Sequence, residues 1–234
     1  QFGEISWFEP AADDHPLAAG MPAGSVTDDT EQALLLADAL IAGGGMVEPQ
    51  PLATALIAWE DQMRVRGSLD LLGPSTQRAV AAAQAGEDVA VTGRYGTTNG
   101  AAMRIAPVGI ATSVADLDLL VERVVAASSV SHNTGIALAG AAAVAAAVSA
   151  GIEGVPVVEP ALQAARAAGH RGFWVAGAEV AARIEWAISL ADPADPQLSL
   201  DRIYRLVGTS LATQESVPAA FGVLAVFPDD PWAA

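Results

Sequence analysis

Two adjacent carboxylates and a hydroxyl occur together in the segment Thr27-Asp28-Asp29-Thr30-Glu31. Thr27 or Asp28 is suited to cap a helix, because the residues that follow are apolar at helical spacing. Neighbouring carboxylates also suit a hard cation such as Mg²⁺ or Mn²⁺, which prefers oxygen ligands. Acidic residues in a first helical turn are favoured by the helix dipole without any ion. The segment alone therefore supports two interpretations, a metal site and a plain helix cap.

A glycine-rich stretch with hydroxyl and amide side chains spans residues 93–111, GRYGTTNGAAMRIAPVGIA. Its centre is the loop Gly96-Thr97-Thr98-Asn99-Gly100, where glycine lets the backbone approach a ligand and the polar side chains can form hydrogen bonds. A glycine-rich turn that enters a helix is a suitable place for a phosphate or a ribose. Similar loops also serve only to pack against a neighbouring helix, so both roles stay open.

Two basic side chains occur beside apolar segments. Arg104 lies within one, and we expect a guanidinium buried there to have a carboxylate partner. His132 precedes the apolar run that begins at Gly135, so we expect it at the N-terminus of a helix. There it is either satisfied by the backbone or free to donate to a substrate hydroxyl or phosphate.

The elements that must position these residues are helices. Apolar residues recur at helical spacing, glycines and prolines separate the segments, and no alternating strand pattern of any length is present. Pro218 is expected in the first turn of the last helix, where its missing N–H is harmless. We predict an all-α protein of about nine helices, with an irregular lead-in over residues 1–24 and a single globular multi-helix domain over residues 24–234. Predicted helices begin near Thr27 and span about 51–66, 75–86, 115–127, 135–150, 159–168, 176–190, 199–208 and 214–226.

Composition limits the partners. The 234 residues are 52% hydrophobic, which is ample for a core. Eleven Lys and Arg against 27 Asp and Glu give a net charge of −16, which repels nucleic acid and anionic membranes. The chain has no cysteine, so disulfides and thiolate metal sites are impossible. We expect a cytoplasmic protein with neither nucleic acid nor membrane as a partner.

The most apolar run, from Gly135 to Ala150, consists mostly of alanine. It is shorter than the ~20 residues that a membrane-spanning helix needs. We therefore predict that it forms the central helix of a bundle, where small side chains let neighbouring helices pack closely.

Four segments carry a family resemblance when taken in order. They are TDDTEQALLLA, TTNGAAMRIAPVGIA, SHNTGIALAGAAAVAAAVSAG and ESVPAAFGVLAVFPDDPWAA. Together they resemble the ADP-ribosylglycohydrolase family, the group that contains the dinitrogenase-reductase-activating glycohydrolase, from about Gly24 to the C-terminus. The resemblance implies an all-α fold with two Mg²⁺ or Mn²⁺ ions at the base of a cleft. It also implies hydrolysis of the glycosidic bond at the C1″ ribose carbon of ADP-ribose.

The same resemblance implies roles for individual residues. Thr27, Asp28 and Asp29 match the first metal-ligand motif, and the two aspartates are the catalytic candidates. The loop 96–100 matches the stretch that lines the ADP-ribose site, and His132 matches a histidine near the substrate. One aspartate could take a proton from the attacking water while the other stays a metal ligand, and the sequence does not assign these roles.

The chain also departs from the family pattern. The family opens with a Gly-Asp-Ala-type motif and closes with a Gly-Asp-Thr-Asp-type motif, and neither is present, while Asp229 and Asp230 are interpreted as a loop. We therefore expect a domain that is incomplete at both ends, with part of the metal site.

Several alternatives consequently stay open. The first is a metal-dependent hydrolase of ADP-ribose conjugates, and the second is a non-catalytic ADP-ribose or nucleotide binder or a structural member of the family. The segment WEDQMRVRGSLDLLGPST is similar to members encoded beside nucleoside-catabolism enzymes, which keeps a smaller nucleoside-type glycoside open as substrate. Apolar surface left by absent terminal helices could be covered in a homo-oligomer.

Overall fold

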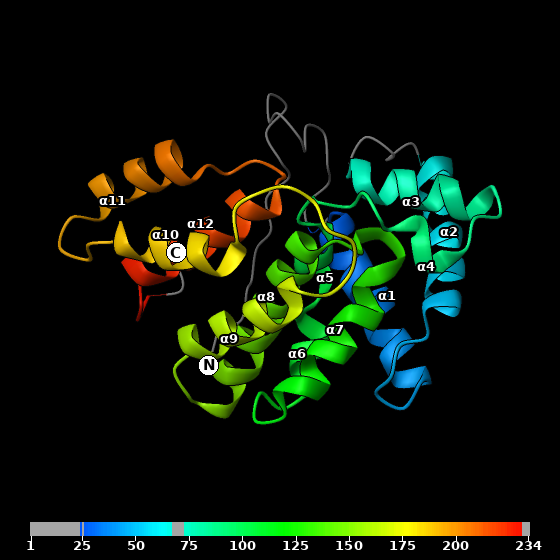
Figure 1. Cartoon of the computed structure of the whole chain (residues 1–234), viewed down its shortest axis with the longest axis horizontal. Helices are drawn as coiled ribbons and strands as arrows, with labels where there is room; N and C mark the ends of the chain where they lie inside the picture. Colours follow the sequence, from blue (N-terminus) through cyan, green and yellow to red (C-terminus); the bar gives the residue numbers. More distant parts are fainter. Residues whose placement is uncertain (1–23, 25, 67–72, 231–234) are drawn as a thin grey trace.

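Helix α8, Gly135–Glu153, occupies the centre of the molecule, and the other helices surround it (Figure 1). This computed structural model describes residues 24, 26–66 and 73–230. Within those ranges the chain forms twelve α-helices and one π-helix, and its β-type pairing is limited to two isolated bridges. The predicted all-α fold is confirmed. The elements around α8 are α1 (Asp28–Ala42), α2 (Pro49–Arg66), α3 (Pro74–Gln84), α4 (Val89–Thr92), α5 (Gly100–Arg104), α6 (Ala106–Ala111), α7 (Leu117–His132), α9 (Val158–Gly169), α10 (Val180–Ser189), α11 (Pro196–Arg202), the π-helix η2 (Ile203–Val207) and α12 (Thr213–Val226).

Small side chains make α8 a core helix. Most of its residues are alanine or glycine, so α5, α6, α7, α9, α10 and α12 can all pack against it. Among the described helices, α8 is the one long and apolar enough to cross a membrane by length and composition alone. Because 67% of its apolar window is buried inside the protein, the predicted role as central helix accounts for its composition.

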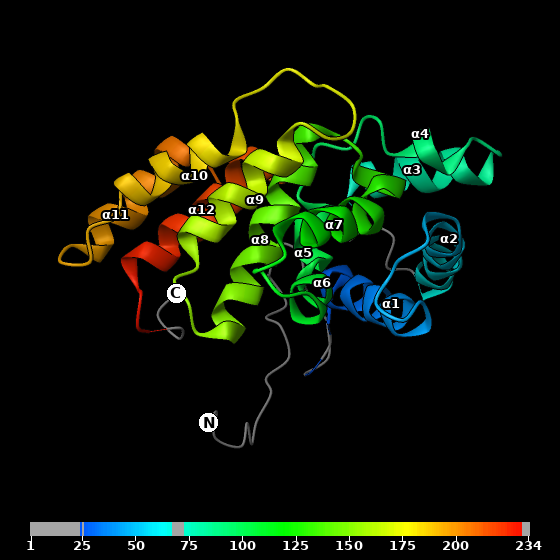
Figure 2. The same ribbon diagram turned by 60° about the horizontal axis from the view of Figure 1, so that its bottom comes forward.

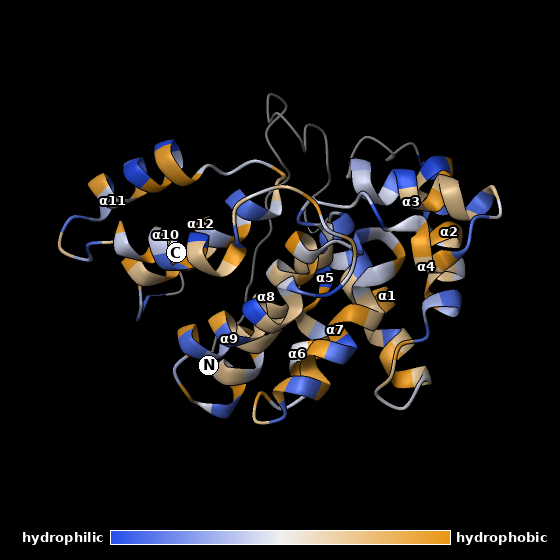
Figure 3. Ribbon diagram, in the orientation of Figure 1, coloured by the Kyte–Doolittle hydropathy of each residue, from blue (hydrophilic) through white to orange (hydrophobic). Residues whose placement is uncertain are grey.

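The remaining helices form two groups on either side of α8. Helices α1 to α4 lie on one side, and α10, α11 and α12 lie on the other, as both views show (Figures 1 and 2). Leu36 of α1 and Val124 of α7 belong to the core cluster of the first side, while Ile184 of α10 and Phe221 of α12 belong to that of the second. Outlying α11 alternates between hydrophilic and hydrophobic residues, as expected of a peripheral helix with one apolar face (Figure 3).

Helix α7 is longer than predicted, and this changes the position of His132. We expected a helix over residues 115–127 and His132 at the start of the next helix. Instead α7 runs from Leu117 to His132, and the N-cap of α8 is Thr134. The helix continues because Val124, Ala127 and Val130 extend one buried face past residue 127. His132 is therefore the last residue of α7.

Proline 218 lies inside α12 and not in its first turn as predicted. The helix begins at Thr213, so Pro218 is its sixth residue. Proline lacks the N–H that would bond to the carbonyl four residues earlier, which belongs to Gln214. That carbonyl accepts a hydrogen bond from Arg183 Nε at 3.1 Å instead. A side chain from α10 therefore satisfies the carbonyl that the proline leaves free.

Other predicted boundaries can be compared at both ends of the chain. The lead-in lies outside the described residues except for Gly24. Asp229 and Asp230 follow α12 in a turn, which agrees with their interpretation as a loop.

Candidate functional site

The predicted metal-binding residues lie at the N-terminus of α1. Thr27 is the N-cap, but its hydroxyl donates to Asp29 Oδ2 at 3.0 Å and makes no capping bond to a backbone N–H. Asp28 is buried, with 7% of its surface exposed, whereas Asp29 is exposed. The plain-cap interpretation therefore lacks its characteristic hydrogen bond, and two neighbouring carboxylates occupy different environments.

Burial changes the acidity of Asp28. Loss of water around the carboxylate, followed by the negative charge of Asp29, raises the pKa of Asp28 to about 6 from an ordinary value of 3.8. Near neutral pH the ionised form is therefore held against an energetic cost. A cation at this position would reduce that cost.

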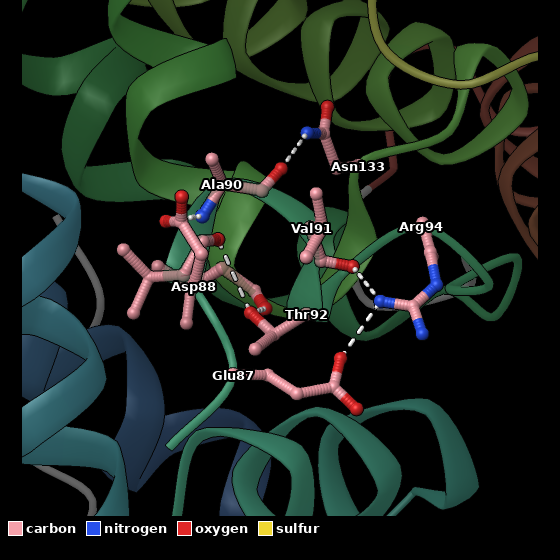
Figure 4. A network of polar contacts seen from close by, with 9 residues as sticks. Glu87, Asp88, Ala90, Val91, Thr92, Arg94 and Asn133 are labelled. Atoms are coloured by element: carbon pink, nitrogen blue, oxygen red, sulfur yellow. Dashed lines mark hydrogen bonds and ion pairs between the residues drawn. The ribbon is translucent and has the colours of Figure 1, made fainter.

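The end of α7 holds the turn that precedes the glycine-rich loop. Thr92 Oγ1 donates to the Val130 carbonyl at 2.6 Å, and Asn133 Nδ2 donates to the Ala90 carbonyl at 3.3 Å (Figure 4). These bonds fix α4 against the C-terminal turn of α7. The loop consequently begins from a rigid base beside His132.

The glycine-rich loop is tied down on both sides. On the α7 side, a Cβ at Gly96 would overlap the Ser131 carbonyl oxygen, so only glycine fits this approach. On the other side, the Thr97 carbonyl accepts from Thr213 Oγ1 at 2.9 Å, and Asn99 N donates to the Leu211 carbonyl at 2.9 Å. The loop therefore bridges α7 and the start of α12. Its packing and its proposed ligand role are compatible, because the side chains of Thr97, Thr98 and Asn99 remain half-buried.

His132 is fully buried, with both ring nitrogens bonded to side chains. Nδ1 lies 2.8 Å from Ser131 Oγ, and Nε2 lies 2.9 Å from Thr98 Oγ1. Neither the backbone bond nor the free donor that we expected is present. The pKa of His132 lies well below its ordinary value, first because of burial and then because of the charge of Arg104. The ring is therefore neutral near pH 7, and its Nε2 holds the Thr98 hydroxyl through a hydrogen bond.

Arg104 is buried as predicted, but its partners are neutral. Nη1 donates to Gln32 Oε1 at 2.8 Å, and Nη2 donates to Ser131 Oγ at 2.7 Å. Within the described ranges no carboxylate forms an ion pair with Arg104, so the predicted carboxylate partner is wrong. The packing of α5 directs the guanidinium between α1 and α7, where an amide and a hydroxyl are in reach. Burial lowers the pKa of Arg104 to about 10, and the group stays charged near pH 7.

These contacts form one continuous chain of side chains through the core. Gln32 Nε2 donates weakly to Asp28 Oδ2 at 3.5 Å, which connects α1 to Arg104 and through it to Ser131. The chain joins all three sequence motifs in the order Asp28, Gln32, Arg104, Ser131, His132 and Thr98.

Gln32 and Ser131 were missed from the sequence. A weak indication existed for Gln32, because it lies four residues after Asp28 and therefore on the same face of the helix. Ser131 offered none, since serine is common near helix ends. Only the tertiary structure brings these two residues to Arg104.

The donor set at α1 fits a hard divalent cation. Thr27, Asp28 and Asp29 supply oxygen atoms only, and the buried Asp28 carboxylate lies beside a second negative charge. No cluster of three or more acidic, histidine or cysteine side chains occurs in the described part of the chain. If a metal ion binds here, the described residues would supply only part of the coordination that Mg²⁺ or Mn²⁺ requires.

Comparison with known proteins identifies the family of this chain. The family model for ADP-ribosylglycohydrolase matches residues 3–234. The uncharacterized protein YegU of Escherichia coli K12 is 33% identical over 98% of this chain and 70% of its own length. An uncharacterized protein of Archaeoglobus fulgidus is 26% identical over 94% of this chain and 65% of its own length.

The fold itself also has a solved counterpart. A structure titled "ADP-ribosylglycohydrolase-related protein complex" superimposes with a TM-score of 0.51 at 23% identity, covering 91% of this chain and 77% of that one. Its helical architecture is the one described above. The chain belongs to the ADP-ribosylglycohydrolase family.

Proposed function

We propose that this chain is a metal-dependent hydrolase of the glycosidic bond in ADP-ribose conjugates, on a modified protein or a small molecule. Family membership supports a glycosidase-type hydrolase. The observation that carries the proposal further is the series of hydrogen-bonded side chains from Asp28 to Thr98, which connects the acidic segment to the glycine-rich loop. This connection supports our proposal that two motifs about 70 residues apart in the sequence serve one site.

The residues of α1 would hold the ion. Thr27, Asp28 and Asp29 are the ligand candidates, and Mg²⁺ or Mn²⁺ suits their oxygen atoms. When bound, such a cation supplies Lewis-acid polarisation of a ribose hydroxyl or of a water molecule. One of the two aspartates would accept a proton from the attacking water, while the other remains a ligand.

The residues of the loop would hold the substrate. The backbone of Gly96 and Gly100 comes close to Ser131 and His132 at the end of α7, and the half-buried side chains of Thr97, Thr98 and Asn99 between these glycines are the candidates to contact a ligand. Hydroxyl and amide groups recognise ribose hydroxyls and phosphate oxygens. His132 contributes through Thr98, because its own ring has no exposed surface.

A calorimetric titration with Mn²⁺, with and without ADP-ribose, tests this proposal. We expect binding that is lost when Asp28→Asn and Asp29→Asn are combined, because both substitutions remove a charged ligand. Asp38→Asn is the matched control, since Asp38 is an exposed carboxylate on the same helix. This control should bind Mn²⁺ as the wild type does.

Turnover is then measured as release of ADP-ribose from conjugates, with Mn²⁺ or with EDTA. Hydrolysis that proceeds unchanged in EDTA would refute the metal-dependent reaction. Thermal stabilisation by ADP-ribose without turnover would favour the non-catalytic binder, because a ligand specific to the folded state raises stability by mass action.

A further inference from the structure

Arg104 imposes a direction on the hydrogen bonds around it. A guanidinium has five N–H donors and no acceptor, so each group that it contacts must present a lone pair. Its two terminal nitrogens contact Gln32 and Ser131, and its Nε has no hydrogen-bond partner among the described residues. With 1% of its surface exposed, Arg104 is shielded from bulk solvent.

On the α1 side this requirement orients the amide of Gln32. Because Oε1 must face Arg104, the amide nitrogen must face Asp28, and it lies 3.5 Å from Asp28 Oδ2. Gln32 is fully buried, so no alternative partner competes for either end of the amide. Asp28 therefore faces an N–H donor and not a second acceptor.

On the α7 side the requirement passes through a hydroxyl and an imidazole. Ser131 Oγ accepts from Arg104 Nη2 and lies 2.8 Å from His132 Nδ1. If Nδ1 carried the proton, the Ser131 hydroxyl would accept twice and its own proton would have no acceptor among the described side chains, so the arrangement that uses this proton has Ser131 donating to Nδ1. A neutral imidazole that accepts at Nδ1 carries its proton at Nε2, and this N–H donates to Thr98 Oγ1. The Thr98 hydroxyl has then accepted one hydrogen bond and still holds its own proton. No described side chain takes that proton.

We infer that Arg104 is a positioning residue that fixes this direction, so that the Thr98 hydroxyl donates its proton to an oxygen of the substrate. The inference rests on the proposed function for the identity of that substrate. Thr98 then selects ligands that present an acceptor oxygen, such as a ribose or a phosphate oxygen. The His132 ring itself exchanges no proton with substrate.

Nitrogen NMR of histidine in the wild-type protein tests the direction without any ligand. Long-range ¹H–¹⁵N spectra distinguish a protonated Nε2 from a protonated Nδ1, and the chain has 3 histidines. The variants His15→Gln and His170→Gln assign the remaining signal to His132. We expect a neutral ring protonated at Nε2. A ring protonated at Nδ1, or at both nitrogens near pH 7, overturns the inference.

Substitution of Ser131 tests the transmission from Arg104. Ser131→Ala removes the donor to Nδ1, so His132 should lose its preference for the Nε2 proton. Ser128→Ala is the matched control, because Ser128 is a fully buried serine of the same helix whose hydroxyl has no hydrogen-bond partner in the described part of the chain. We expect the control to keep the wild-type tautomer. An unchanged tautomer in Ser131→Ala overturns the role of Arg104.

Titration with ADP-ribose tests the consequence for substrate. Loss of one donated hydrogen bond should weaken binding by about five-fold in Ser131→Ala and leave Ser128→Ala unchanged. In a Thr98→Val background, Ser131→Ala should not weaken ADP-ribose binding further. If Ser131 had only a structural role, Ser131→Ala would weaken binding in both the wild type and Thr98→Val. A wild type that binds no ADP-ribose refutes the proposed function, and the tautomer measurement still decides the direction of the chain.

Discussion

Replacement of Asp28 by asparagine should stabilise the metal-free protein at neutral pH. The pKa of Asp28 is raised to about 6 from 3.8, so the folded state binds this proton more tightly than the unfolded chain does. The contribution of Asp28 to the free energy of unfolding is therefore greatest at low pH, where its carboxyl is protonated in both the folded and the unfolded protein. This contribution falls as pH rises from about 4 to about 6 and stays low above that range. Asparagine resembles the protonated carboxyl and does not titrate. The Asp28→Asn variant therefore does not lose this stability as the pH rises.

The size of the effect follows from the shift. The difference between the ordinary pKa of 3.8 and the folded-state pKa of about 6 corresponds to a loss of up to ~3 kcal/mol in the free energy of unfolding, once Asp28 is fully ionised in both the folded and the unfolded protein. At about pH 5 the Asp28 carboxyl is still mostly protonated in the folded protein but ionised in the unfolded chain, so roughly half of this loss has occurred. The gain from Asp28→Asn should consequently be about twice as large at pH 7.5 as at pH 5.

Urea unfolding followed by circular dichroism, in EDTA at both pH values, measures this difference. Asp38→Asn controls for the general effect of removing one negative charge from a chain of net charge −16, and it should change stability by less than about 0.5 kcal/mol. With Mn²⁺ in place of EDTA, the wild type should gain stability and Asp28→Asn should not. A variant that is less stable than the wild type in EDTA, or equally stabilised at both pH values, would refute the reasoning.

Two further predictions concern the packing that supports the site. Gly96→Ala should destabilise the protein by about 2 kcal/mol or more in urea unfolding, because its Cβ overlaps the Ser131 carbonyl. A Cβ at Gly73 meets no described atom within 4 Å, so Gly73→Ala should cost clearly less. Leu138→Ala should cost about 3 kcal/mol, since this α8 side chain is fully buried, and Leu224→Ala, at 39% exposure, should cost clearly less. Equal losses within either pair would contradict the packing described here.

Helix positions could be predicted from the sequence wherever local chemistry sets the end. Gly43 ends α1, and Pro74 stands in the first turn of α3, as their residue types indicate. The extension of α7 to His132 and the start of α12 ahead of Pro218 depend on other helices. The carbonyl that Pro218 leaves free is satisfied by a residue of α10, which a reading of α12 alone does not include.

The site could be predicted only as separate motifs. The acidic segment and the glycine-rich loop were identified by composition and by family resemblance, and their assignment as metal and substrate residues stays a prediction. So do the cytoplasmic location and self-association. The connection between the motifs could not be predicted, because Gln32 and Arg104 are 72 residues apart and the bond between them depends on how α5 packs between α1 and α7.

The absence of a carboxylate partner for Arg104 among the described residues bears on the proposed metal site. A carboxylate in direct contact with the guanidinium would have been neutralised by it, and its lone pairs would have been occupied by N–H donors. Here the amide of Gln32 separates the two charges, and its own bond to Asp28 is long, at 3.5 Å. Asp28 therefore forms no ion pair with Arg104, and its raised pKa reflects burial and the charge of Asp29. The amide of Gln32 thus lets a buried arginine lie near a buried carboxylate that we propose as a metal ligand, without the direct ion pair that would neutralise it.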